Sequence, residues 1–181
     1  MKKSSILLSL ILVSYSALSL NITRSDVAFE VGQSYEMTPF YINFDPGSDG
    51  IGVTWDLSSL PDGVPGLNTN VIGDDVSLFP TANTVQSVGI GYRNYLYITD
   101  NSMELVGVDF SGFVRDYTNP HTIMSFPVTN TYYFTDTFEY TAGMHTWEGS
   151  FQSEFSGYGT LITPEGTFTD AVRLKETTIQ I

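Results

Sequence analysis

The sequence predicts an all-β protein: an antiparallel β-sandwich, jelly-roll-like or Ig-like, with little or no helix after a signal peptide. Two observations predict this fold. After residue 19, no window repeats apolar residues at i, i+3, i+4 and i+7 over three turns. The chain instead contains short runs rich in Val, Ile, Thr, Tyr and Phe, bounded by Gly, Pro, Asn and Asp, as strands and turns are. Stacked sheets bury one face each without helices, which favours a sandwich.

The predicted strands follow one another at short intervals. Asp100-Asn101 separates two alternating runs as a hairpin turn would, and Ala142-Gly143-Met144 does the same further on. Loops are expected at "NFDPGSDGIG", "SSLPDGVPGLNTNVIGDD" and "VRDYTNPHT". The expected strands are 27–31, 35–43, 52–57, 76–79, 84–92, 95–99, 104–110, 121–126, 132–134, 137–141, 145–155, 159–163 and 167–175.

The stretch "GYGTLITPEGTFTDAVRLK" predicts a β-hairpin over 157–175. Pro164 presets the φ angle at the second position of a type I turn. Gly166 is then expected to adopt a left-handed conformation that closes the hairpin with a bulge. Turn chemistry accounts for the polar residues here. A binding site in this hairpin would instead use Thr160, Thr163, Glu165 and Asp170.

The first 19 residues have the layout of a secretory signal peptide. Lys2 and Lys3 precede a short apolar run at 6–13, and Ala17-Leu18-Ser19 fits signal peptidase, with cleavage before Leu20. The run is much shorter than the ~20 residues that a membrane span needs. Cleavage leaves 181 − 19 = 162 residues, a single domain over 20–181 that is secreted or held at the cell surface.

The charge of the chain restricts its partners. Without Lys2 and Lys3 the chain keeps 7 − 2 = 5 basic residues against 20 acidic ones, a net charge of −15. Such a surface repels nucleic acids and anionic lipids and attracts cations, of which calcium is the obvious extracellular one. The chain has no cysteine, so it is neither a bacterial lipoprotein nor stabilised by disulfides.

The segment "DPGSDGIGVTWD" is a partial match to a calcium-binding loop. Asp45, Asp49 and Gly50 occupy positions 1, 5 and 6 of an EF-hand, but Gly47 at position 3 has no ligand atom in its side chain. Asp56 stands where the bidentate Glu is required. No cofactor is expected beyond calcium held weakly by such a loop. The weak candidate ligands are Asp45, Asp49, Asp74 and Asp75.

No set of residues indicates a reaction. The chain lacks a G-x-S-x-G elbow and a zinc-binding H-x-x-x-H pattern, and His121 and His145 fit ordinary strand or loop positions. A glycosidase needs two carboxyl groups ~5–10 Å apart. Glu148 and Glu154 would be about 20 Å apart on one strand, and Glu139 could pair with either. No catalytic residue is assigned, and the chain is expected not to be an enzyme.

Aromatic residues make up 14% of the chain. Packing in a core without disulfides explains this content, and Trp55 is expected to point inward because it alternates with polar neighbours. Exposed Tyr and Trp could instead stack on sugar rings. An exposed, flat row of three aromatic residues beside a carboxylate would favour a carbohydrate-binding or carbohydrate-active protein, whereas buried rings and no pronounced cleft would favour a structural module.

Several of these motifs resemble, in order and spacing, a β-rich N-terminal module of secreted Bacteroidota proteins that use type IX secretion. They are the "GYGTL…P-x-G-T…R-x-K" hairpin, "DPGSDGIGVTWDLSSL", "MELVGV" and "MSFPVTNTYYFTDTF". Taken alone, each of these motifs has only the residue pattern of ordinary strands and turns. The family generally carries a sorting domain after this module, whereas this sequence stops at Ile181, so a truncated chain or a variant without the sorting signal is implied.

The sequence therefore predicts an exported, non-catalytic structural or interaction module of a secreted or cell-surface protein. Its expected partners are other extracellular or surface proteins, or glycans. The alternative is a carbohydrate-binding or carbohydrate-active protein that uses exposed aromatic residues and a carboxylate.

Overall fold

The computed structural model describes residues 20–27, 30–37, 47–59, 68–89 and 91–181. These residues form a nearly all-β structure, which confirms the predicted fold class. The one helix among them is a single 3₁₀ turn, η1 (Arg24–Asp26). The strands are β1 (Ser34–Met37), β2 (Gly50–Asp56), β3 (Asn68–Gly73), β4 (Thr84–Val88), β5 (Tyr92–Ile98), β6 (Ser102–Phe110), β7 (Phe113–Ser125), β8 (Tyr133–Ala142), β9 (His145–Thr163) and β10 (Gly166–Gln180).

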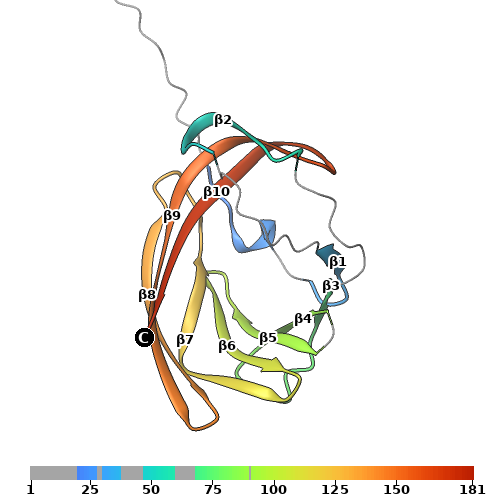
Figure 1. Ribbon diagram of the computed structural model, residues 1–181, viewed down its shortest axis with the longest axis vertical. Coiled ribbons are helices and arrows are strands. Elements are labelled where there is room, and N and C mark those ends of the chain that lie inside the picture. Colours follow the sequence, from blue (N-terminus) through green and yellow to red (C-terminus); the bar gives the residue numbers. More distant parts are fainter. Residues whose placement is uncertain (1–19, 28–29, 38–46, 60–67, 90) are drawn as a thin grey trace, which may run out of the picture.

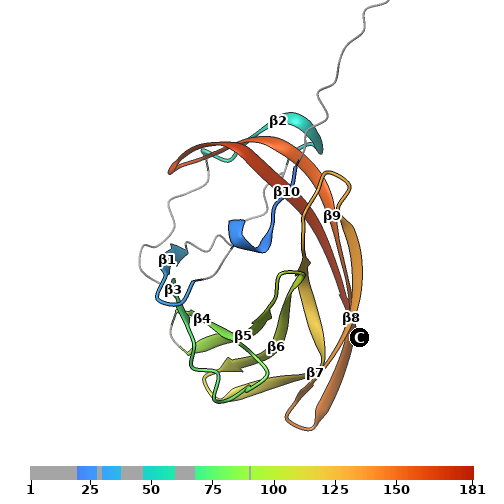
Figure 2. The ribbon, with the colours of Figure 1, turned by 180° about the vertical axis from the view of Figure 1, so that it is seen from behind.

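All ten strands belong to one hydrogen-bonded sheet in the order β1-β3-β4-β5-β6-β7-β8-β9-β10, with β2 attached to β9. Neighbours in this order run antiparallel, so most of the sheet is a meander of consecutive strands. Figures 1 and 2 show that the sheet curls strongly, with β1 and β10 as its two end strands. A sandwich of two separate sheets is therefore not confirmed.

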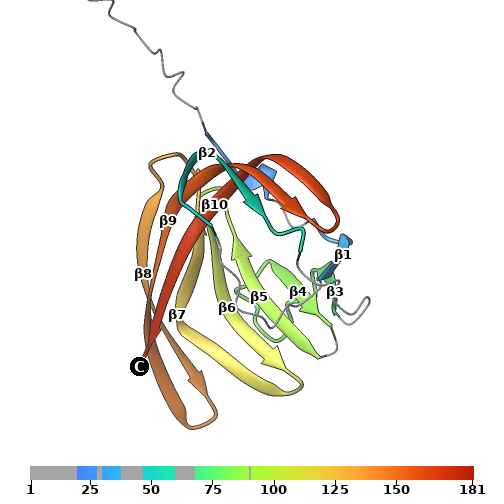
Figure 3. The same cartoon turned by 45° about the horizontal axis from the view of Figure 1, so that its top comes forward.

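The long strand β9 has three partners. Along one edge, β8 pairs with its first half and β2 with its second half, since Tyr133 faces Glu154 and Gly50 faces Gly157. The β2–β9 pairing is parallel, and Figure 3 shows β2 lying along this part of β9. Along the other edge, β10 completes the predicted hairpin, with Thr163 opposite Gly166. Gly166 has a φ of 156°, positive but nearly extended rather than left-handed helical.

Two glycines of the "GYGT" motif allow β2 to approach β9. A Cβ atom at Gly159 would lie 1.9 Å from the carbonyl oxygen of Val53 in β2. A Cβ atom at Gly157 would lie 2.7 Å from the Trp55 ring. Both positions therefore require glycine for close packing rather than for a turn.

Two predicted strands are wrong. Of the predicted strand 27–31, residues 28 and 29 lie outside the described residues, while Val27 is the C-cap of η1 and Val31 lies in a turn. Segment 76–79 is a loop whose Phe79 ring packs against the Tyr95 ring of β5, with the ring centres 4.8 Å apart and the planes tilted at 52°. Phe79 is buried, whereas Val31 and Leu78 are exposed, so the strand-like composition of these segments did not reflect strand pairing.

Two predicted loops contain strands. The end of "SSLPDGVPGLNTNVIGDD" forms β3, and "VRDYTNPHT" lies within β7. Pro120 is tolerated in β7 because residues 117–120 fall in a register shift, where the pairing with β6 jumps between Asp116 and His121. Two predicted pairs of short strands are also continuous, forming β8 and β9.

Most of the buried apolar residues fall into three clusters, whereas others, such as Ile72, Val108 and Val128, lie outside them. One lies under the 74–83 loop, where the Phe79 ring packs against Gly107 so closely that a Cβ there would be 2.4 Å away. The second is aromatic and joins β8 to β9 through Phe138, Tyr140 and Phe151. The third joins β5, β6 and β7 around Leu96, Ile98 and Met103. Trp55 is also buried, as predicted.

The predicted signal peptide and Asp45 lie outside the described residues. In the part of the chain that is described, no helix has the length and apolar character that crossing a membrane requires.

Candidate functional site

Three aromatic residues lie in a row across neighbouring strands at one end of the sheet. Tyr92 of β5 is directly opposite Phe110 of β6, which is directly opposite Phe113 of β7. Directly opposite residues share a face of the sheet, so the three rings project from the same side. Phe110 and Phe113 are 56% and 53% exposed, and Tyr92 contacts Phe110 edge to face at 5.8 Å.

The turn between β8 and β9 extends this row. The β7–β8 pairing includes Arg115 opposite Ala142, so the turn that follows Ala142 lies beside the start of β7. Met144 in this turn is 98% exposed, and Trp147, just after it, is 40% exposed. We call Tyr92, Phe110, Phe113, Met144 and Trp147 the aromatic rim. The rim is built on two hairpin ends, which Figure 1 shows at the same end of the sheet.

Behind the rim, aromatic rings continue inward in an unbroken series of contacts. Trp147 stacks on Tyr140 at 6.5 Å, and Tyr140 lies 5.1 Å from Tyr117. Arg115 places its guanidinium 5.4 Å from the centre of the Tyr140 ring. The series, in order of contact, is Trp147, Tyr140, Tyr117, Phe138, His121, Phe151, Phe134 and Tyr132.

Tyr117 is a neutral hydrogen-bonding group within this series. Burial raises the pKa of its phenol to about 12, although Arg115 acts in the opposite direction. The hydroxyl therefore stays protonated at neutral pH and can donate a hydrogen bond.

His121 is a packing residue. Its ring stacks on Phe138 at 4.5 Å and meets Phe151 edge to face at 4.8 Å. Burial lowers the pKa of His121, with Asp136 opposing the shift. Asp136 accepts a hydrogen bond from the Thr122 amide at 2.7 Å, where β7 turns away from β8. His145 is exposed at the start of β9, so both histidines fit the ordinary roles expected for them.

The acidic residues near the aromatics lie on the other side of the sheet. The sequence left the partner of Glu139 open, and the structure places Glu148 directly opposite it. Tyr140 and Trp147 form the adjacent pair and therefore project from the opposite face. The two carboxylates cannot flank a sugar stacked on the rim, so this arrangement does not provide the carboxylate pair of a glycosidase.

The calcium candidate at Asp49 is occupied by protein contacts. Arg173 lies 3.4 Å from the Asp49 carboxylate and donates to the carbonyls of Gly47 and Ser48 at 3.1 and 3.2 Å. Ser156 also donates to Asp49. In the described part of this loop, the oxygens of Gly47, Ser48 and Asp49 are thus already bound to a guanidinium, and Asp56 accepts hydrogen bonds from Ser58.

The second calcium candidate is a turn. Asp75 accepts a hydrogen bond from the Ser77 amide at 3.3 Å, and its bonds with Ser77 lower its pKa. Asp74 is exposed beside it. Among the described residues, no group of three or more His, Asp or Glu side chains could hold a metal ion, so calcium binding stays a prediction.

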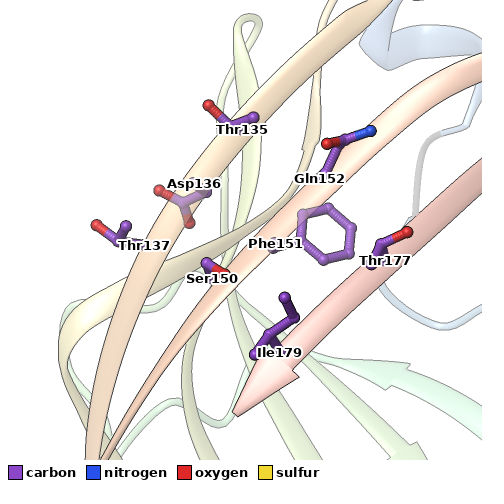
Figure 4. A pocket seen from close by; sticks show the side chains of 8 residues that line it. All are labelled: Thr135, Asp136, Thr137, Ser150, Phe151, Gln152, Thr177 and Ile179. Atoms are coloured by element: carbon purple, nitrogen blue, oxygen red, sulfur yellow. The ribbon is translucent and has the colours of Figure 1, made fainter. Parts of the chain in front are cut away.

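Two surface pockets lie near the residues described above. The larger, of about 390 Å³, lies across β8, β9 and β10, and Figure 4 shows its mainly polar side chains on these three strands. Its single charged group is Asp136, which already bonds to Thr122. The other, of about 330 Å³, lies beside Trp55 and Arg173, which hold β2 in place. Neither brings together groups for catalysis. The larger is lined by Thr135, Asp136, Thr137, Ser150, Phe151, Gln152, Thr177 and Ile179.

No protein-family model, curated protein or solved structure matches the chain. Fold and surface together define an all-β protein with an exposed aromatic rim and a buried aromatic series behind it. Sequence reasoning did not single out Phe110, Phe113 or Met144. Their signal is that Phe110 and Phe113 flank the turn in "FSGF" and that Met144 lies within the turn in "AGMH", at positions where polar residues are usual.

Proposed function

We propose that the chain is an exported, non-catalytic interaction module that binds an extracellular or surface partner through the aromatic rim. The observation that carries the proposal is the row formed by Tyr92, Phe110 and Phe113 on three neighbouring strands. Single exposed apolar residues are ordinary on protein surfaces, whereas contiguous ones mark interaction sites. Aromatic residues are also enriched at protein interfaces.

The rim is suited to binding because its parts are held in place. Aromatic side chains rotate about only two bonds, so they lose little conformational entropy on binding. The strand pairing fixes the backbone beneath Phe110 and Phe113, and Trp147 is supported by Tyr140 and the rings behind it. A surface prepared in this way can supply anchor residues, each worth ~2 kcal/mol or more when fully buried by a partner.

Export is part of the proposal. The signal-like residues 1–19 support it, and the excess of acidic residues suits a soluble extracellular surface. The resemblance to secreted type IX modules of Bacteroidota supports a secreted or cell-surface location.

Carbohydrate binding without hydrolysis is the second candidate function. It is favoured by the neighbouring Trp147, Tyr140 and Arg115, because Trp and Tyr faces stack on sugar rings and a guanidinium donates hydrogen bonds to hydroxyl groups. Three rings do lie in a row, but Tyr92 is half-buried and meets Phe110 edge to face, so the row is not flat, and the Glu139–Glu148 pair is on the other face.

The test is to remove the two exposed phenylalanines together. Labelled protein carrying Phe110→Ala and Phe113→Ala is compared with wild type for binding to the surface of the cells that produce it, and on a glycan array. We expect at least about tenfold weaker binding, equivalent to ~1.4 kcal/mol. Phe168→Ala is the matched control, because Phe168 is 51% exposed but lies near the β9–β10 turn.

Binding that is equal in the double variant and wild type would contradict the proposal. Glycan binding that is lost with Trp147→Ala would establish the second candidate. Binding to cells without any glycan signal would favour a protein partner.

A further inference from the structure

The outer edge of β10 is a long, regular backbone edge. On its inner side β10 pairs with β9, and within the described residues no strand pairs with its other side. Ile181 and Glu148 exchange backbone hydrogen bonds of 2.9 and 3.4 Å, so Ile181 is turned toward β9. Backbone groups alternate along an antiparallel strand. The residues whose N–H and C=O groups point outward are therefore Leu174, Glu176, Thr178 and Gln180.

The first half of this edge is protected against pairing, and the second half is not. A bulge lies between Phe168 and Ala171, with Asp170 at a φ of 63°, and a further register shift follows Arg173. Such irregularities are among the devices by which proteins blunt edge strands. The described part of the opposite end strand, β1, spans four residues.

From Leu174 to Gln180 the pairing with β9 is uninterrupted. The segment "TTIQI" over 177–181 contains no proline and no charge, and four of its five residues are β-branched. Ile179 is 58% exposed. A regular edge of this length and composition is competent to receive another strand.

We propose that this edge pairs with the same edge of a second copy of the chain, joining the two sheets across a two-fold axis. A two-fold axis perpendicular to the sheet requires antiparallel pairing of identical segments. Side chains alternate between the two faces of a strand. The faces of the two sheets are therefore continuous only when the two-fold axis passes through a residue, and not when it passes between two residues. The register centred on Thr177 places the outward-pointing Glu176 opposite Thr178, and Leu174 opposite Gln180.

Charges disfavour the registers on the N-terminal side of this one, and the register centred on Thr178 would leave Leu174 without a partner among the described residues. Centring the axis on Lys175 or on Glu176 would place that residue opposite its own copy, and like charges directly opposite are destabilising. Centring it on Thr177 places Lys175 opposite Ile179 and engages all four outward-pointing residues. The short uncharged segment is therefore self-complementary in a chain whose net charge is −13.

The same net charge gives the dimer a distinctive salt dependence. Two strongly acidic copies repel each other, and raising salt from about 0.1 M to about 1 M shortens the Debye length from about 10 to about 3 Å. Since the paired edges contribute backbone hydrogen bonds and no intermolecular ion pair in this register, association should strengthen with salt. A dimer held by ion pairs would weaken instead.

The decisive experiment uses the absence of cysteine. In Thr177→Cys, the two thiols meet at the axis as a non-hydrogen-bonded pair, with Cα atoms ~4.5 Å apart, within the range for a disulfide. Oxidised glutathione is the oxidant, and covalent dimer is measured on a non-reducing gel. Thr137→Cys is the matched control, because Thr137 is exposed on β8, away from the edge. We expect the Thr177→Cys variant to cross-link rapidly and the Thr137→Cys control not to. The proposal would be overturned if both variants cross-linked at the same rate, or if Thr177→Cys did not cross-link at all.

Analytical ultracentrifugation provides an independent measurement. Thr178→Pro removes an outward N–H while leaving the bonds to β9 in place, since proline is tolerated on the open side of edge strands. This variant should be monomeric at concentrations where wild type and Thr178→Val dimerise. Wild type that stays monomeric in about 1 M salt, or a Thr178→Pro variant that still dimerises, would show the proposal to be wrong. Gln180 at the end of this edge donates a hydrogen bond to the Tyr140 hydroxyl at 2.7 Å, but Thr177 and Thr178 are not rim residues, so both variants leave the rim residues unchanged.

Discussion

The guanidinium of Arg173 lies over the indole of Trp55, 5.9 Å from the ring centre. The indole N–H donates to the carbonyl of Ser48 at 3.0 Å, and Arg173 donates to the same carbonyl at 3.2 Å. Strand β2 and residues 47–49 before it are thereby held against β10, while the backbone of β2 pairs with β9. A tryptophan and an arginine that are distant in the sequence are thus in direct contact, and this contact joins β2 to the β9–β10 hairpin.

Trp55→Ala should lower the free energy of unfolding by ~3–5 kcal/mol, because a large buried ring is removed together with its hydrogen bond. Trp147→Ala, which truncates a 40% exposed ring, should cost less than ~1 kcal/mol. Urea denaturation of both variants measures the difference. Equal losses would mean that Trp55 does not anchor β2.

Gly159→Ala should destabilise the protein by ~1–3 kcal/mol, because its Cβ would collide with the backbone of Val53 and force β2 away from β9. Gly73→Ala is the control, since a Cβ there meets nothing within 4 Å. Hydrogen exchange should show faster exchange of β2 amides in Gly159→Ala only. Unchanged protection of β2 would contradict the close approach.

Asp170→Val should cost ~1–2 kcal/mol, because Asp170 has a φ of 63°, a conformation that β-branched residues resist. Tyr158 donates a hydrogen bond to the Asp170 carboxylate, which raises the pKa of Tyr158. Asp170→Asn keeps an acceptor and tolerates the left-handed conformation, so it should change stability by less than ~0.5 kcal/mol. Thermal melts of the two variants test whether Asp170 has a conformational role, and equal losses would refute it.

Lowering the pH from 7 toward 5.5 should destabilise the protein through His121. Burial lowers the pKa of folded His121, so the unfolded chain takes up a proton first as pH falls below the ordinary value of 6.5. The stabilisation is complete above that value and is lost below it. His121→Phe should remove this part of the pH dependence, and His145→Phe, at an exposed position, should not. Identical pH profiles for all three proteins would rule out His121 as the cause.

The fold class could be predicted from sequence because strand composition and turn residues act locally. The hairpin at Thr163–Gly166 and the inward position of Trp55 followed from turn chemistry and from the alternation of side chains. Local rules failed where tertiary contacts decide. Phe79 resembles a strand residue but packs from a loop, and Pro120 resembles a loop residue but sits in a register shift.

By itself, the sequence determined an acidic, cysteine-free chain rich in β-segments, because charge, composition and side-chain periodicity are properties of neighbouring residues. Only the tertiary structure decided that these segments form one curled sheet and that β2 lies parallel to β9. It also decided that Phe110 and Phe113 share a face with Tyr92, and that Glu139 meets Glu148 on the opposite face. The physical reason is register: a shift of one residue moves every side chain to the other face, and pairing between distant strands sets it.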